Sequence, residues 1–326
     1  MKIFLRLDDL KTHFPVYRGA ILRRLVGVVK AVDGINLELH KGEILGLVGE
    51  SGCGKSTLAR TIMQLIPNTD GVVSLEGRHL SNLSQTQIRS ERANFQMIFQ
   101  DPYASLNPHM TVYDTLAEAI RTRKKVGGKR LLEKVAQLMT TVGLPPNQMQ
   151  RYPHEFSGGQ RQRIAIARAL APEPKLVIAD EPVSALDVSI QSQIISLILK
   201  LCREMEVTVI FISHDISVVK YISDRIAVMY LGRLVEIGPA AHVVEKPLHP
   251  YTRALVSAVP VPDPSREQKR KRIILEGDPP SPMSPPHGCT FHPRCRYAVE
   301  ACKVARPELE EKEPERFAAC VRIGEI

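Results

Sequence analysis

The sequence reads Gly49-Glu50-Ser51-Gly52-Cys53-Gly54-Lys55-Ser56-Thr57 directly after the apolar run Ile44–Val48. That run predicts a buried strand, and the residues after the loop carry the pattern of a helix. A GxxxxGKS spacing between a strand and a helix is typical of a phosphate-binding loop. The sequence therefore predicts a nucleotide-binding α/β fold.

The chemistry of this loop depends on its backbone as much as on its side chains. The glycines let backbone N–H groups close around phosphates, and the helix N-terminus adds its positive dipole end. We expect Lys55 to reach the β- and γ-phosphates and the Ser56 hydroxyl to bind Mg²⁺. The helix terminus would also lower the thiol pKa of Cys53, although we expect Cys53 to act through its backbone N–H. All nine loop residues are candidate ATP-binding residues.

Two adjacent acids follow a second apolar run, Leu176–Ala179. Neighbouring strand positions point to opposite sides, so Asp180 and Glu181 are expected to differ in role. We expect Asp180 to hold Mg²⁺ through its water shell and Glu181 to polarise the attacking water.

The chain alternates between helices and strands after residue 158. We expect helices at Gly158–Leu170 and Ile190–Met205 and strands at Leu176–Ala179 and Thr208–Ile212, which predicts a parallel sheet. A β-rich start and a helical stretch from about Thr111 to Val142 precede them.

The length of 326 residues and the 44% apolar content predict one large domain and a smaller one. Composition shifts to proline after Ala258, so we expect domains at residues 1–258 and 259–326. No apolar run is long enough to span a bilayer, and residues 1–10 do not resemble a signal peptide. We therefore expect a cytoplasmic protein. The net charge of +9 suits nucleic acid, anionic lipid or polyphosphate without choosing among them.

A further segment, Phe156-Ser157-Gly158-Gly159-Gln160-Arg161-Gln162-Arg163, resembles the signature sequence of the ABC ATPases, with Phe156 where many members have Leu. Other motifs follow the order of that family. Gln100 resembles the Q-loop glutamine, Ser184–Asp187 the D-loop, and His214 the switch histidine.

This resemblance implies a P-loop NTPase of the ABC cassette type. The expected fold has a RecA-like core, an antiparallel β subdomain and an α-helical subdomain, with a small cysteine-containing C-terminal appendage. The implied activity is ATP hydrolysis coupled to transmembrane transport, as in a translocase. In the family the signature reaches the nucleotide held by an opposite subunit, so Ser157, Gly158, Gly159 and Gln160 imply a dimer.

The remaining nucleotide contacts are also implied by the resemblance. Gln100 would contact Mg²⁺ and the attacking water, and His214 would contact the γ-phosphate. An aromatic ring is expected to stack on adenine. Phe14 best matches the family position, with Tyr17 as the alternative.

Two stretches resemble the ATPases of dipeptide and oligopeptide importers, namely residues 100–108 (QDPYASLNP) and His249-Pro250-Tyr251-Thr252 with Leu255. The implied partners are a second, different ATPase, two membrane permease subunits and, indirectly, an extracytoplasmic peptide-binding protein. The implied location is the cytoplasmic face of the inner membrane. Similar proteins also import nickel, sugars, glutathione or antimicrobial peptides, so the cargo stays open.

Four of the six cysteines gather in the tail, with 5, 6 and 17 residues between Cys289, Cys295, Cys302 and Cys320. In a cytosolic protein such a group favours a metal over disulfides. The spacing lacks the CxxC pairs usual for zinc, and four thiolates suit a [4Fe–4S] cluster, with which peptide-importer ATPases have been associated. Zinc and unligated thiols are the alternatives. A metal would stabilise a small proline-rich unit.

The alternative function is a soluble ABC ATPase that acts on nucleic acid or ribosomes. The layout argues against it, because the chain has one cassette and only about a hundred residues, without sustained heptads, separate Lys55 from Ser157. We therefore expect no nucleic-acid partner. A non-hydrolysing regulatory subunit is disfavoured by the presence of both Glu181 and His214.

Overall fold

The structure is a computed structural model and describes residues 2–19, 24–123, 125–259 and 272–325. The chain divides into two compact units. The loop unit comprises Lys2–Leu39, Ile44–Ser81 and Phe211–Ile326, and the helical unit comprises His40–Glu43 and Asn82–Ile210. Strand β8 (Thr208–Ile212) includes residues on both sides of the division.

The loop unit contains two sheets and the elements around them. Its strands and helices are β1 (Ile3–Arg18), β2 (Arg24–His40), β3 (Ile44–Val48), α1 (Lys55–Ile62), β4 (Asp70–Leu75), β5 (Arg78–His79), α8 (Ile216–Ile222), β9 (Arg225–Tyr230), β10 (Arg233–Pro239), α9 (Ala240–Glu245), α10 (Pro250–Ala258), α12 (Glu300–Val304), β11 (Glu310–Glu313) and β12 (Arg316–Ala318). Short 3₁₀ turns lie at Leu80–Asn82 and His292–Arg294.

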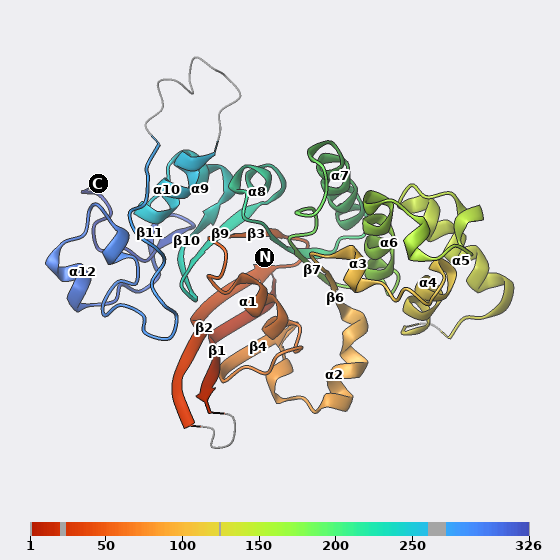
Figure 1. The fold of residues 1–326 in the computed structure, drawn as a ribbon, viewed down its shortest axis with the longest axis horizontal. Coiled ribbons are helices and arrows are strands. Elements are labelled where there is room, and N and C mark those ends of the chain that lie inside the picture. The colour runs from red at the N-terminus through yellow and green to blue at the C-terminus, as the bar shows by residue number, and fades with distance from the viewer. Residues whose placement is uncertain (1, 20–23, 124, 260–271, 326) are drawn as a thin grey trace, which may run out of the picture. The chain divides into compact units, whose positions relative to one another are not determined.

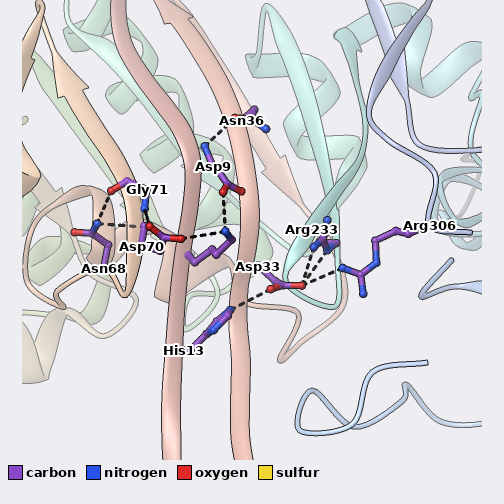
Figure 2. Close-up of polar contacts among 10 residues, drawn as sticks. Asp9, His13, Asp33, Asn36, Asn68, Asp70, Gly71, Arg233 and Arg306 are labelled. Carbon is purple, nitrogen blue, oxygen red and sulfur yellow. Dashed lines mark hydrogen bonds and ion pairs between the residues drawn. The ribbon is translucent and has the colours of Figure 1, made fainter. Parts of the chain in front are cut away.

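The first sheet of the loop unit has the strand order β2-β1-β4-β5 and is drawn in red to orange in Figure 1. β1 pairs antiparallel with β4, with Leu5 opposite Leu75, and the register shifts between Asp8 and Lys11. At this bulge the Nζ of Lys11 bridges the carboxylates of Asp9 (2.6 Å) and Asp70 (3.2 Å). Figure 2 shows these two carboxylates. The sheet forms the antiparallel β subdomain predicted from the family.

The second sheet places the phosphate loop. In the loop unit its strands run in the order β11-β12-β10-β9-β3. β3 is buried along its whole length and pairs parallel with β9, with Leu45 opposite Arg225. The loop at residues 49–54 thus leaves a strand that is fixed by the core.

The helical unit carries the remaining motifs. It contains α2 (Gln85–Glu91), β6 (Phe95–Ile98), α3 (Pro102–Ser105), α4 (Val112–Arg121), α5 (Gly128–Thr141), α6 (Gly158–Leu170), β7 (Leu176–Asp180) and α7 (Val188–Glu204), with 3₁₀ turns at Arg92–Asn94, Pro146–Gln148 and Pro153–Glu155. β6 and β7 pair parallel, with Phe95 opposite Leu176. The parallel pairing predicted from the alternating pattern is confirmed here.

The helical stretch expected from about Thr111 to Val142 contains two helices, α4 and α5. The chain leaves helical geometry before α5 at Gly127, the helix N-cap, and Gly128 has a φ of +56°. The strands β1, β2, β11 and β12 had not been predicted. The expected domain boundary at 258/259 falls at the end of α10 and stays a prediction; residues 260–271 of the proline-rich stretch lie outside the described residues.

Within residues 2–19, 24–123, 125–259 and 272–325, no helix is both long enough and apolar enough to cross a bilayer.

Candidate nucleotide-binding site

The phosphate loop in the loop unit requires glycine at two of its positions. Gly49 has φ +156°, and a Cβ there would lie 2.2 Å from the backbone oxygen of Met229. Gly54 is the N-cap of α1 with φ +107°, and a Cβ there would lie 2.0 Å from the backbone oxygen of Ala31. Both positions therefore exclude a side chain by close approach as well as by backbone conformation. Gly52, with φ +78°, has nothing within 4 Å of a Cβ and depends on conformation alone.

Lys55 begins α1 and is 4% exposed. Its Nζ donates to the backbone oxygens of Gly49 (2.7 Å) and Glu50 (3.0 Å). The ammonium is thereby held inside the loop that is predicted to surround the phosphates. Ser56 and Thr57, the predicted Mg²⁺ ligand and its neighbour, lie in the first turn of the same helix.

Cys53 corrects one expectation. Its side chain is only 6% exposed, and this burial raises the thiol pKa even though Lys55 lies 3.9 Å away and acts to lower it. A lowered pKa at the helix terminus had been expected. The raised pKa fits a passive side chain whose backbone N–H belongs to the loop.

Glu50 is anchored by residues from far along the chain. Its backbone N–H donates to the hydroxyl of Tyr251 on α10 (2.8 Å), and its carboxylate accepts two bonds from the guanidinium of Arg294 (2.8 and 3.2 Å). Sequence reasoning placed Glu50 in the loop but missed both partners. The resemblance had singled out Tyr251 as part of a family motif without giving it a contact.

The predicted adenine platform lies on β1. Phe14 is 36% exposed and Tyr17 is 55% exposed. The neighbouring His13 approaches the carboxylate of Asp33 on β2, with Nε2 3.1 Å from Oδ1. Figure 2 shows Asp33 between His13 on one side and the guanidinium groups of Arg233 (2.9 Å) and Arg306 (3.4 Å) on the other. Burial acts to raise the pKa of Asp33, but Arg233, Lys30 and His13 together outweigh it and the pKa is lowered.

The helical unit brings two of the predicted catalytic residues together. Gln100 lies after β6, and its Nε2 donates to the carboxylate of Glu181 (3.2 Å). Asp180 ends β7 and is 4% exposed, whereas Glu181 is half-buried with a left-handed φ of +46°. The two acids differ in environment, as their opposite directions along a strand had indicated. A left-handed glutamate is a strained position of the kind found at functional sites.

The signature residues begin α6 in the same unit. Ser157 is the N-cap: its hydroxyl accepts from the Gln160 N–H (3.4 Å), and the Gln160 side chain accepts from the Ser157 N–H (3.0 Å). A Cβ at Gly159 would lie 2.8 Å from the Ile190 side chain. The sequence pattern predicts that the serine and glycines contact a phosphate. It did not reveal that this capping box and close packing also shape the helix start.

His214 follows β8 and is exposed in the loop unit, directly before Asp215, which caps α8. It is the predicted γ-phosphate contact of that unit. The structure therefore places Lys55, Ser56, Phe14 and His214 in the loop unit. It places Gln100, Asp180, Glu181 and the signature in the helical unit.

The four tail cysteines line one small cavity, together with His249, Phe291 and His292 among others. The backbone N–H of Cys289 donates to the backbone oxygen of Cys302 (2.8 Å). Burial raises the pKa of the Cys289 thiol to about 11 and also raises the pKa values of Cys295 and Cys320. Among the described residues, no group of three or more His, Cys, Asp or Glu side chains is arranged to hold a metal ion. The expectation of an iron–sulfur centre thus lacks support from the side-chain geometry.

Comparison with known proteins agrees with the motifs. Residues 32–184 match the ABC transporter family, and residues 235–302 match the oligopeptide/dipeptide transporter C-terminal region. The chain is 52% identical to the oligopeptide transport ATP-binding protein AppF of Bacillus subtilis (strain 168), over 97% of this chain and 96% of AppF. This chain belongs to the family of ATP-binding subunits of oligopeptide ABC transporters.

Other proteins are similar to this ABC ATPase in sequence or in fold. It is 53% identical to the oligopeptide transport ATP-binding protein OppF of Escherichia coli (strain K12), over 95% of this chain and 93% of OppF. A dimeric ATP-binding cassette, MJ0796, solved in a post-hydrolysis state with ADP and Pi, superposes with a TM-score of 0.64 at 27% identity. That match covers 72% of this chain and 98% of the cassette. The cassette cbiO1 of Clostridium perfringens superposes with a TM-score of 0.65, also at 27% identity, over 76% of this chain and 93% of cbiO1.

The family membership confirms the ABC cassette fold and the ATPase activity predicted from the sequence. ATP, with Mg²⁺, is the nucleotide that such an enzyme uses.

Proposed function

We propose that this ABC ATPase hydrolyses MgATP to drive the uptake of dipeptides or oligopeptides. The observation that carries the proposal is the phosphate loop with Lys55 held inside it, in a chain that also pairs Gln100 with Glu181. The peptide class is supported by the C-terminal region match at residues 235–302 and by the two relatives named as oligopeptide transport proteins.

Each site residue then has a distinct role. Lys55 and the loop amides bind the β- and γ-phosphates, and Phe14 stacks on adenine. Glu181, oriented by Gln100, accepts a proton from the attacking water, and His214 contacts the γ-phosphate. Ser56, Gln100 and Asp180 supply oxygen donors, which suit Mg²⁺. When bound, Mg²⁺ neutralises charge on the phosphates.

The proposed assembly contains a second, different ATPase, whose signature completes this chain's nucleotide site. In exchange, Ser157, Gly158, Gly159 and Gln160 of this chain contact the partner's nucleotide. Two membrane permease subunits would bind the pair at the cytoplasmic face of the membrane, and an extracytoplasmic peptide-binding protein would deliver cargo. The capping box of Ser157 and Gln160 supports this role, because it fixes the helix start that would meet the γ-phosphate.

Affinity purification from the native membrane tests this assignment. We expect two permease subunits and a second ATPase to co-purify with the tagged chain, and peptide to stimulate ATP turnover in the reconstituted complex. Co-purification of nucleic acid or ribosomes without permeases would instead favour the soluble alternative. Stimulation by nickel, a sugar or glutathione in place of peptide would correct the cargo alone.

We also propose that residues 259–326 form an appendage whose four cysteines bind a [4Fe–4S] cluster. All four line one cavity, which supports this proposal. Their side chains are not arranged to hold a metal ion in the described residues, so they would have to turn toward one another on loading. Since thiolates are the ligands, loading would also release protons from the thiols. Anaerobically purified protein should contain iron and sulfide and show a broad visible absorbance band. Protein that contains zinc alone, or no metal, would rule out the cluster.

A further inference from the structure

The tail segment between Cys289 and Cys295 contacts the phosphate loop directly. The guanidinium of Arg294 makes two bonds to the carboxylate of Glu50, at 2.8 and 3.2 Å. The Arg294 side chain is 8% exposed and the Glu50 side chain 25% exposed, so solvent screens the pair only in part. Two parallel bonds of this kind hold the carboxylate in one orientation, and the guanidinium also neutralises its charge.

A second route from the same segment reaches the backbone of Glu50. Phe291 is 2% exposed and packs against the rings of Tyr230 and Tyr251, with centroids 5.3 and 5.4 Å away. The Tyr251 hydroxyl in turn accepts the Glu50 N–H at 2.8 Å. The side chain of Glu50 is thus held by the tail, and its backbone is held by a ring on which the tail packs.

These contacts matter because of the charge of the loop's ligand. A phosphate loop binds a polyanion, and a carboxylate inside it would repel the phosphates unless a cation neutralises it. Glu50 is such a carboxylate, and Arg294 supplies the cation. The Glu50 backbone oxygen also accepts from Lys55 (3.0 Å), so a displaced Glu50 would disturb the loop's own lysine.

A second arginine of the tail, Arg306, also contacts the ATP-binding cassette. Arg306 lies 3.4 Å from Asp33, which also contacts Arg233 and His13, the neighbour of the adenine-platform candidate Phe14 (Figure 2). Within the loop unit, the tail therefore makes contacts near both the phosphate loop and the strand that carries Phe14.

We propose that Arg294 and Phe291 are positioning residues for ATP binding, which makes the cysteine-bearing tail a working part of the nucleotide site. Arg294 neutralises Glu50, and Phe291 supports the tyrosine that fixes the Glu50 backbone. The proposal rests on ATP binding at this loop and gives the appendage a role that is independent of whether its cysteines bind a metal.

The test measures the dissociation constant of MgATP for the full-length chain. We expect Arg294→Met to raise it about tenfold, since removing one partner of a part-buried pair leaves the other charge unpaired. Adding Glu50→Gln to Arg294→Met should restore affinity to within about threefold of the unmodified protein, because no carboxylate then faces the phosphates. If Arg294 only stabilised the fold, Glu50→Gln would not restore the MgATP affinity that Arg294→Met removes.

Arg296 provides the matched control, since it is an exposed arginine two residues after Arg294, just beyond the segment. Arg296→Met should leave the dissociation constant within about twofold, as expected of a surface charge. An unchanged constant in Arg294→Met, or a double variant no better than Arg294→Met, would overturn the proposal.

Arg294→Lys decides the question if Arg294→Met does not fold. Lysine keeps the charge and loses the second bond, so we expect a rise of about threefold and faster amide exchange over residues 50–54. No change in either measurement would overturn the proposal. Lys55→Ala belongs in the same series: if it also binds MgATP normally, the loop is not the nucleotide site, and the failure lies with the proposed function.

Discussion

The phosphate loop and the acidic pair are held by different means. The loop is built into the protein: Lys55 is 4% exposed, and Glu50 is tied to Tyr251 and Arg294. Glu181 instead lies half-buried with a left-handed backbone, and its partner Gln100 is exposed. The difference teaches that contacts within this chain preform the phosphate loop, whereas the residues proposed to act in hydrolysis are more open to solvent.

The strongest challenge to this contrast is Glu181→Gln. Turnover by the assembled transporter should fall by about a thousandfold, the scale of a lost general base. The MgATP dissociation constant of the isolated chain should stay within about threefold, because the preformed loop is untouched. Steady-state phosphate release and a binding titration check the two halves of this prediction. Undiminished hydrolysis in the assembled complex would remove Glu181 from the proposed mechanism.

Gly54→Ala tests the preformed loop itself. A Cβ there would lie 2.0 Å from the Ala31 oxygen in a backbone with φ +107°, so we expect MgATP affinity to fall about a hundredfold, equivalent to roughly 3 kcal/mol. Gly52→Ala is the control, because its Cβ meets nothing within 4 Å and only the conformational cost of about 1–2 kcal/mol remains. Equal losses in the two variants would show that close packing is not what shapes the loop.

The pH dependence of stability tests the role of His249, which caps the helix that carries Tyr251. His249 caps α10 by accepting the Tyr251 N–H, and burial lowers its pKa to about 3 from 6.5. The unfolded chain therefore binds a proton at a pH where the folded chain does not. The stability that this difference provides is fully present above pH 6.5 and is lost as the pH falls towards 3.

The expected loss from His249 is about 2 kcal/mol between pH 7.5 and pH 5. His249→Asn keeps a capping acceptor and removes the titration, so urea unfolding should show a shallower pH dependence in this variant. The same slope in both proteins would contradict the assignment to His249.

The smallest expected effect separates the two adenine candidates. Phe14→Ala should raise the MgATP dissociation constant about fivefold, near the 1 kcal/mol that an aromatic contact contributes. Tyr17→Ala should change it less than twofold. The reverse result would move the platform to Tyr17 and leave the rest of the comparison intact.

Sequence patterns found the elements whose signal is local. The strand before the phosphate loop, the helix at Gly158–Leu170 and the strand Thr208–Ile212 all lie where periodicity and glycine spacing put them. The helical stretch at about residues 111–142 was also found, but the bounds of its two helices were not given, because periodicity does not show that Gly128 adopts a left-handed conformation. A left-handed glycine interrupts a helix without changing its apolar pattern.

The site was predictable in its motif residues and not in its supports. Lys55 and Glu181 carry a recognisable spacing, and the roles proposed for them stay predictions. Arg294 pairs with Glu50 across 244 positions of the sequence, and Arg306 reaches Asp33 across 273. No local pattern encodes such long-range pairs, so only the folded chain reveals them. The raised thiol pKa of Cys53 was also not predictable, because it comes from burial of the side chain, which the loop pattern does not show.

Strands β11 and β12 form one edge of the second sheet. β12 pairs with β10, and β11 lies outside it with four exposed residues, Glu310–Glu313, of which three are acidic and one is a lysine. A sheet edge invites pairing with another chain, and closely spaced charges discourage it. The charges of β11 therefore disfavour aggregation at this edge. Without residues 310–318, strand β10 would become the open edge of the sheet.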